Sequence, residues 1–431
     1  MMSGRLTDKK GRPAVVVTGM GIVTSLGWGK QENWVALKNG RCGIKSISRF
    51  PTDGLKTTIA GTIPNRPGHT PENYSACDLS LAIAEFAAAE AIEQAGIGGA
   101  GSFPGPLIVA TPPSELEWPH LRRLYLANDD KQQTGYRGLR TAARSGEFAN
   151  LARHVRFAAI ADALQSRFGT LGEPLSVCTA CASGSSTIQF AVEAIRRGEA
   201  EAAVCVGTDA TVHREGLIRF SLLSALSTRN DPPQRASRPF SRSRDGFVIA
   251  EGAGALVLES YRHAAARGAE PLGVVLGAGE KADCYHRTRS QPDGAAIIGA
   301  ITKALEDAAV DPEDIDHINA HGTSTPENDR MEYVSLRSVF GGRLSDIPIT
   351  SNKSQIGHTL IAAGAVEAVI ALLSLQNGIV PPTINYRDPD PEIPLDVVAN
   401  TARKVSMRTV LSNSFGFGGQ NVCLVFAAEP N

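Results

Sequence analysis

The strongest constraint on the fold is the alternation of short apolar strands with Ala-rich helical stretches. One helical pattern runs from Leu79 to Ala95, and Gly96 is its expected C-cap. The predicted strands are Ala14–Thr18, Leu107–Ala110, Ala203–Val206, Ala255–Leu258, Gly273–Leu276, Ile315–Asn319, Pro348–Ser351, Thr409–Leu411 and Val422–Phe426. Strands that alternate with helices predict an α/β fold in which most strands are buried.

The order of these elements hints at a duplication. Ala87–Ala110 reads helix, turn, strand, and Ile298–Ala320 repeats that order. Leu175–Gly198 reads strand, polar turn, helix and glycine, as does Ile347–Gly378. The residues themselves do not repeat, so the order alone predicts two similar halves, joined around Tyr261–Pro271.

Composition excludes several classes of protein. The chain has 431 residues, 42% of them hydrophobic, which allows a large core. A net charge of −1 argues against a nucleic-acid binder held by bulk charge, so any acidic partner must meet a local basic patch. The apolar runs are short and interrupted, so we expect no membrane span, and Met1–Pro13 is too polar for a secretory signal. Seven scattered cysteines suit a reducing cytoplasm better than a disulfide framework.

Cys181 lies where a predicted strand passes into a helix. The run from Leu175 reads Leu-Ser-Val-Cys-Thr-Ala-Cys-Ala-Ser-Gly-Ser-Ser, and a helical pattern continues over Thr187–Ile195 until Gly198. Unpaired N–H groups and the positive end of the helix dipole favour the thiolate, the nucleophilic form of cysteine. A small buried cysteine at a tight turn is the competing interpretation.

Three further polar segments follow predicted strands: residues 319–326, residues 351–358 and residues 413–421. Ligands bind at loops that leave the carboxyl ends of strands in an α/β sheet. A lone His321 or His358 would more often be a hydrogen-bonded structural histidine. Two histidines and a lysine on such loops, together with Cys181, favour one shared site.

These motifs resemble those of the β-ketoacyl-acyl-carrier-protein synthases, most closely the type II elongating enzymes of the thiolase-like superfamily. The resemblance spans Val15 to Phe426. Its motifs are Thr179-Ala-Cys-Ala-Ser-Gly184, His321-Gly-Thr-Ser-Thr-Pro326, Lys353-Ser-Gln-Ile-Gly-His358 and Asn413-Ser-Phe-Gly-Phe-Gly-Gly419, with Leu226–Asn230 and Arg244–Phe247 as further family segments.

The resemblance implies a duplicated thiolase-like α/β fold, layered α-β-α-β-α with two mixed sheets. We accordingly expect a polar extension over residues 1–12. The N-terminal half, residues 13–265, would carry the nucleophile, and the C-terminal half, residues 266–431, would carry the histidines and the lysine. The resemblance also implies a homodimer in which a central strand of each subunit pairs across the interface.

The family activity is a decarboxylative condensation of an acyl chain, held on cysteine, with malonyl-acyl-carrier-protein, as in fatty acid elongation. By resemblance, Cys181 is the nucleophile, and His321 and His358 hold the malonyl carbonyl and stabilise its enolate. Lys353 orders the site, with Glu367 as its carboxylate partner. No cofactor or metal is implied, because the phosphopantetheine arm arrives on the acyl carrier protein.

Other site residues follow from the same motifs. The backbone N–H groups of Cys181 and Phe417 match an oxyanion hole for acyl transfer, and Phe415 supports that loop. Thr323 and Thr325 match residues that bind the pantetheine arm.

Competing interpretations concern single motifs. Cys178 and Cys181 form a C-x-x-C, which could indicate a redox pair or half a zinc site, but no second C-x-x-C exists and Cys178 fits the strand. Residues 19–27 faintly resemble a dinucleotide fingerprint with wrong spacing, and we predict a structural turn there. A non-catalytic chain-length partner of the same fold usually lacks the nucleophile, which is present here. A thiolase typically has a second cysteine where this chain has Phe415 and Phe417.

The chain departs from the family at the acyl pocket. Thr111–Leu116 replaces a Gly-rich turn, which puts Ser114 at the place of the residue that gates the pocket, and an unusual segment follows over Trp118–Arg144. Phe220 matches a pocket-lining residue, although a plain core phenylalanine is nearly as well supported, and Gln420 replaces the usual threonine. These departures predict a specialised acyl preference.

An acidic carrier protein needs a basic landing surface. Basic residues cluster in the atypical segment: Arg122, Arg123, Lys131, Arg137, Arg140 and Arg144. Each is as compatible with a solvated surface as with docking. Ser224 lies where many relatives have a docking arginine, and Arg219 is nearby in the sequence. We therefore assign no individual residue to the docking of the carrier protein.

Overall fold

The structure is a computed structural model that describes residues 6–68, 70, 74–98, 101–113, 115–127 and 136–429. Two of the residues singled out above, Ser114 and Lys131, lie outside the described residues.

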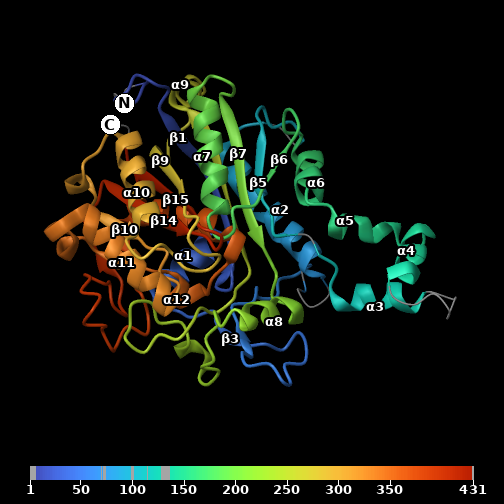
Figure 1. Ribbon diagram of the computed structural model, residues 1–431. Coiled ribbons are helices and arrows are strands. Elements are labelled where there is room, and N and C mark those ends of the chain that lie inside the picture. The colour runs from blue at the N-terminus through green and yellow to red at the C-terminus, as the bar shows by residue number, and fades with distance from the viewer. Residues whose placement is uncertain are drawn as a thin grey trace.

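The first half of the chain alternates strands and helices up to residue 266 (Figure 1). Its strands are β1 (Val15–Thr24), β2 (Gly27–Trp28), β3 (Lys45–Ser46), β4 (Ile59–Ala60), β5 (Leu107–Ala110), β6 (Leu175–Val177), β7 (Ala202–Asp209) and β8 (Gly252–Ser260). Its helices are α1 (Lys30–Lys38), α2 (Ala76–Ala95), α3 (Trp118–Leu126), α4 (Tyr136–Arg144), α5 (Ala152–Val155), α6 (Ala159–Phe168), α7 (Ser183–Arg196), α8 (Arg214–Leu222) and α9 (Tyr261–Ala266). The α2 helix ends at Gly96 with a left-handed φ of 60°, as predicted.

The second half follows the same plan. Its strands are β9 (Gly273–Ala282), β10 (His317–Asn319), β11 (Ile349–Thr350), β12 (Ile379–Val380), β13 (Arg403–Lys404), β14 (Thr409–Phe415) and β15 (Gln420–Ala427). Its helices are α10 (Ala295–Ala308), α11 (Pro326–Phe340), α12 (Lys353–Ile356) and α13 (Ala363–Asn377).

Short 3-10 turns occur in both halves of the chain. They are η2 (Ala149–Leu151) and η3 (Pro233–Arg235) in the first half, and η4 (Pro312–Asp314), η5 (Gly341–Asp346) and η6 (Leu360–Ala362) in the second.

The sheet order shows the duplication directly. The first half contributes β6-β5-β7-β8-β1, and the second half contributes β11-β10-β14-β15-β9, the same order with the same parallel and antiparallel pairs. The two mixed half-sheets are hydrogen-bonded along a short stretch in which Val15–Val17 of β1 pairs antiparallel with β9. The two mixed half-sheets therefore form one continuous path of hydrogen-bonded strands.

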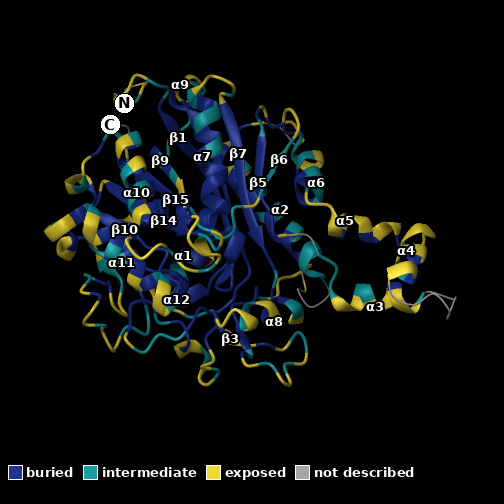
Figure 2. Ribbon diagram, in the orientation of Figure 1, coloured by how far each residue is buried: buried dark blue, intermediate teal, exposed yellow. Residues whose placement is uncertain are grey.

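Five layers are stacked as the resemblance implies. The middle layer consists of α7 and α13, whose apolar residues form one core cluster with strands of both half-sheets. On the outside, α2 and α6 cover the first half-sheet, and α10 and α11 cover the second. Both faces of most strands are therefore buried, which Figure 2 shows as dark blue ribbons at the centre.

The prediction of a turn over residues 19–27 is wrong for most of that stretch. The β1 strand continues through Gly19 and Gly21 to Thr24. A Cβ at Gly19 would lie 1.9 Å from the Ala91 carbonyl oxygen, and one at Gly21 would lie 1.9 Å from that of Ala87. These glycines therefore allow α2 to pack directly on the strand, and they are not turn residues.

The atypical segment forms an arm that projects from the layered body, with α3 and α4 at its far end (Figure 1). A small core of its own, made by Leu124, Ala142, Phe148 and Leu151, holds the arm together. The described arginines of the basic cluster lie exposed on α3 and α4: Arg122, Arg123, Arg137, Arg140 and Arg144.

One helical stretch among the described residues, Leu360–Asn377, has the length and apolarity of a membrane span, with a mean hydropathy of 1.7. Its apolar window is 89% buried inside the protein, since it includes the central helix α13.

Candidate active site

The predicted site residues lie at the carboxyl ends of parallel strands. Cys181 follows β6, His321 follows β10, and Lys353 and His358 follow β11. Phe417 lies in the turn between β14 and β15. Because both half-sheets present these ends to one region, four loops distant in sequence meet at a single cavity, as predicted.

The middle helices bring the two halves of the site together. The backbones of α7 and α13 approach so closely that a Cβ at Gly184 would lie 2.4 Å from the Ala365 nitrogen, and one at Gly364 would lie 2.5 Å from the Ser185 nitrogen. The Cys181 loop precedes α7 and the His358 loop precedes α13. Contact between the two helix starts therefore places cysteine and histidine side by side.

Cys181 lies two residues before the first residue of α7, with its Sγ 3.2 Å from Nε2 of His358. Burial raises the pKa of the Cys181 thiol to about 11, although the Phe417 backbone N–H bonded to the sulfur and the charge of Lys353 both act to lower it. The stabilisation of the thiolate expected from the helix start is thus outweighed by desolvation. In the free protein, Cys181 holds its proton at neutral pH.

His358 is buried and neutral. Burial, followed by the charge of Lys353, holds its pKa well below the usual value. The Leu360 N–H donates to Nδ1 at 3.3 Å, so the ring hydrogen lies on Nε2 and faces the Cys181 sulfur. His358 can therefore donate a hydrogen bond to an oxygen or sulfur at this point.

His321 is neutral for the same reasons. Burial, followed by the charges of Lys353 and His358, holds its pKa well below the usual value. Its ring centroid lies 5.3 Å from that of His358 and 5.6 Å from that of Phe415. Phe415 thus supports one face of the histidine pair. Two neutral imidazoles side by side can donate two hydrogen bonds to one developing oxyanion.

Lys353 and Glu367 form a fully buried ion pair, each with a side chain that is 1% exposed. Burial raises the pKa of Glu367, and the charge of Lys353 opposes that shift. The pair places a cation close to both histidines without giving it access to water.

Removal of one partner from this pair should be costly. Glu367→Ala leaves the Lys353 ammonium buried and unpaired, and we expect a loss of about 3–5 kcal/mol in the free energy of unfolding. The double variant Lys353→Met/Glu367→Leu, which removes both charges, should recover most of that loss. Chemical denaturation measures both values. A Glu367→Ala protein within 1 kcal/mol of the native one would show that the pair is not a buried ionic contact.

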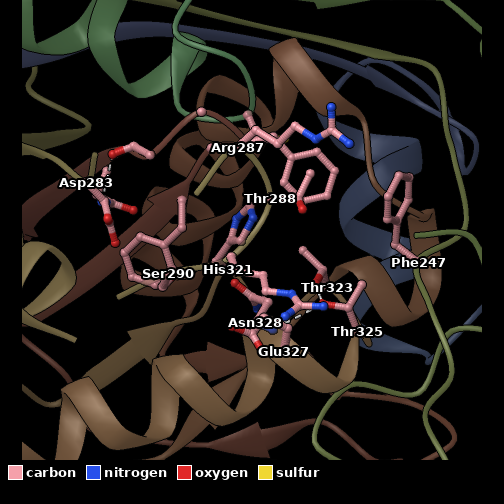
Figure 3. Close-up of a pocket in the computed structure, with 18 of the residues that line it drawn as sticks. Phe247, Asp283, Arg287, Thr288, Ser290, His321, Thr323, Thr325, Glu327 and Asn328 are labelled. Carbon is pink, nitrogen blue, oxygen red and sulfur yellow. Dashed lines mark hydrogen bonds between the residues drawn. The ribbon is translucent and has the colours of Figure 1, made fainter. Parts of the chain in front are cut away.

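The catalytic cavity has about 650 Å³ of empty space, including the open solvent at its mouth, and is lined by Cys181, both histidines, Phe220 and Phe417. Thr323 and Thr325 also line it, and their hydroxyl oxygens lie 2.9 Å apart. Figure 3 shows His321 near the centre of the cavity, between these threonines and the segment that carries Arg287 and Thr288. Thr323, Thr325 and Phe220 thus share one cavity with Cys181, while the other predicted acyl-pocket residue, Ser114, lies outside the described residues.

Three features of the site were missed at the level of sequence. Glu332 on α11 accepts hydrogen bonds from the backbone N–H groups of His321 and Gly322 at 2.9 and 2.7 Å. Phe247 packs on His358, with ring centroids 5.2 Å apart. The segment 286–290 forms one wall of the cavity. Buried polar residues at three-residue spacing on α11, namely Asp329, Glu332 and Ser335, were the available signal for Glu332.

Family models match both halves of the chain. The model of the "Beta-ketoacyl synthase, N-terminal domain" matches residues 12–264, and that of the C-terminal domain matches residues 272–387. The 3-oxoacyl-[acyl-carrier-protein] synthase 2 of Coxiella burnetii is 35% identical over 96% of this chain and 98% of its own length. The tetracenomycin polyketide synthase ketoacyl synthase alpha subunit of Streptomyces glaucescens is 36% identical over 96% of each chain.

Solved structures agree with these relatives. A type II polyketide acyl-carrier protein complex contains a ketosynthase chain with a TM-score of 0.84 and 31% identity, over 96% of this chain and 99% of that one. The ishigamide ketosynthase/chain length factor gives a TM-score of 0.80 and 33% identity, with the same coverage. The fold, the four motifs that meet at one cavity and these full-length matches together show that the chain belongs to the β-ketoacyl synthase family of condensing, acyl-transferring enzymes.

Proposed function

We propose that the protein condenses an acyl chain held on Cys181 with malonyl-acyl-carrier-protein and releases a β-ketoacyl-acyl-carrier-protein. The main support is the 3.2 Å contact between Cys181 Sγ and His358 Nε2, in a cavity that His321 and Phe417 also line.

The first half-reaction loads the chain. The Cys181 sulfur attacks the thioester carbonyl of the acyl carrier protein, the pantetheine sulfur leaves, and the cysteine proton passes to it. Negative charge develops on the carbonyl oxygen, where the Phe417 N–H can donate, since it already lies against the sulfur. The backbone N–H of Cys181 is assigned as the second donor.

The second half-reaction forms the new bond. Malonyl loses carbon dioxide, and the electron pair of the broken bond moves into an enolate whose oxygen receives hydrogen bonds from His321 and His358. The enolate carbon then attacks the acyl carbonyl on Cys181, and the sulfur leaves and regains a proton. Neutral imidazoles suit this step, because a charged histidine could protonate the enolate and end the reaction unproductively.

The partner is an acyl carrier protein, which brings the phosphopantetheine arm, so no resident cofactor is assigned. Thr323 and Thr325 would bind that arm at the wall of the cavity. We further propose a homodimer, and the cytoplasm as the working compartment. The seven cysteines are all unpaired, which supports a reducing environment.

Fatty acid elongation is the pathway we propose, and polyketide extension is the second candidate, because relatives of both kinds match equally well. The test incubates the protein with acyl- and malonyl-carrier protein and follows all products by mass spectrometry. A fatty acid enzyme should add one two-carbon unit to each acyl chain when no reductase is present. Repeated extension of the unreduced product would favour the polyketide role. If Cys181 acquires no acyl group from any carrier protein, a non-catalytic chain-length partner is the better assignment.

A further inference from the structure

A cluster of charged residues joins the atypical segment to α8. Glu115 pairs with Arg219 in the last turn of α8, and its Oε1 lies 3.2 Å from Nε2 of His213, the N-cap of that helix. Glu215 accepts a hydrogen bond from the Trp118 backbone N–H at 2.8 Å. We call Glu115, His213, Glu215 and Arg219 the α8 clamp, since they hold residues 115–118 against the helix at both of its ends.

The clamp consists of closely spaced acidic and basic side chains. His213 has a side chain that is 7% exposed and lies between Glu115 and Glu215. Burial lowers the pKa of His213, but its contacts with the two carboxylates outweigh this and raise it. Contact with His213, and then with Arg219, lowers the pKa of Glu115 to about 2 against the effect of burial. The Glu115 carboxylate is thus the shared partner of His213 and Arg219.

The same helix carries a wall of the catalytic cavity. Phe220, which follows Arg219 directly, lines that cavity and lies 5.4 Å from Phe247 between ring centroids. Phe247 in turn packs on His358 at 5.2 Å. Two aromatic contacts therefore connect the clamped helix with a catalytic histidine.

A second cavity lies at the other end of α8. Its empty space, including the open solvent at its mouth, is about 420 Å³, and Thr111, Pro112, Pro113, Glu115 and His213 are among the residues that line it. His213 and Phe220 are seven residues apart, or roughly 10 Å along a helix. The N-cap of α8 thus lines the second cavity and Phe220 near its other end lines the catalytic cavity. Glu115 contacts this helix at His213 and at Arg219.

We propose that Glu115 sets the upper length of the acyl chain, because the α8 clamp keeps the catalytic cavity separate from the second cavity. This rests on the proposed function, in which the chain extends from Cys181 past Phe220. With the clamp closed, α8 and its phenylalanine end the acyl pocket. With the clamp open, the space of the second cavity becomes available to the end of a longer chain. Glu115 acts through α8 and is a positioning residue.

The test compares Glu115→Ala and Arg219→Ala, which open the clamp from its two sides, with the native protein across acyl carrier proteins of graded chain length. Two readouts are taken for each length: acylation of Cys181 by mass spectrometry, and kcat/KM for condensation. We expect both variants to gain about tenfold in kcat/KM on chains longer than those the native protein prefers. Decarboxylation of malonyl-carrier protein in the absence of an acyl donor should not change.

The control is Glu199→Ala, which removes a carboxylate that pairs with Arg197 away from α8 and is more exposed than that of Glu115. It should leave the length profile unchanged, and Glu115→Asp should restore the native profile. An unaltered profile in both clamp variants, or an equal loss at every chain length, would overturn the proposal. A native protein that acylates Cys181 but never condenses would contradict the proposed function alone, because the acylation profile still tests the clamp.

Discussion

Cys181→Ala is expected to abolish acyl transfer while the fold is retained. The sulfur is the atom that forms the covalent bond, and no other side chain in the cavity described by the structure is a thiol. Alanine is smaller than cysteine and lies before the first residue of α7, so the helix and its packing on α13 should persist. The measurement is the mass shift of the intact protein after exposure to acyl carrier protein.

The control is Cys178→Ala, because Cys178 is the exposed neighbour in the same C-x-x-C. This variant should acylate as the native protein does. A Cys181→Ala protein that still forms a covalent acyl adduct and condenses at a normal rate would exclude Cys181 as the nucleophile.

His321→Ala and His358→Ala should each lower malonyl decarboxylation by about a hundredfold or more, since each removes a donor to the enolate oxygen. The two variants should differ in the first half-reaction. His358 contacts the Cys181 sulfur at 3.2 Å, whereas His321 contacts His358 and Phe415. Acylation of Cys181 should therefore fall in His358→Ala and stay close to native in His321→Ala.

Decarboxylation is followed by carbon dioxide release and acylation by mass spectrometry. His263→Ala serves as the control, because His263 is bonded to Glu259, outside the catalytic cavity. Near-normal decarboxylation in both His321→Ala and His358→Ala would remove the histidines from the mechanism.

Local patterns predicted most of the elements correctly, because buried strands and Ala-rich helices are visible within a few residues. The same local patterns led to a wrong prediction of a turn over residues 19–27. Gly19 and Gly21 suggest a turn, but each lies in a strand whose partner helix comes within van der Waals distance of the backbone. Glycine is needed at these positions because α2 packs on them, and α2 lies about seventy residues further along the chain. The residues next to Gly19 in sequence therefore give no sign of this contact.

The protonation of Cys181 likewise depends on both local sequence and tertiary packing. Its place between a strand and a helix was predictable, and by itself favours the thiolate. Burial beneath the Phe417 loop and against His358 reverses the balance and raises the pKa of the thiol to about 11. Desolvation depends on every segment that covers a side chain, so it is a property of the folded protein.

The α/β class, the duplicated order of elements and the loops that carry Cys181, His321, Lys353 and His358 could all be predicted from the amino-acid sequence. These follow from local periodicity and from motifs of a few residues each. Only the tertiary structure decided which loops meet, because the contact of α7 with α13 joins the two halves of the site. It also brings Glu115 against Arg219, 104 residues away, on the helix that carries Phe220. Contacts between residues so far apart depend on the packing of whole layers, which no local pattern records.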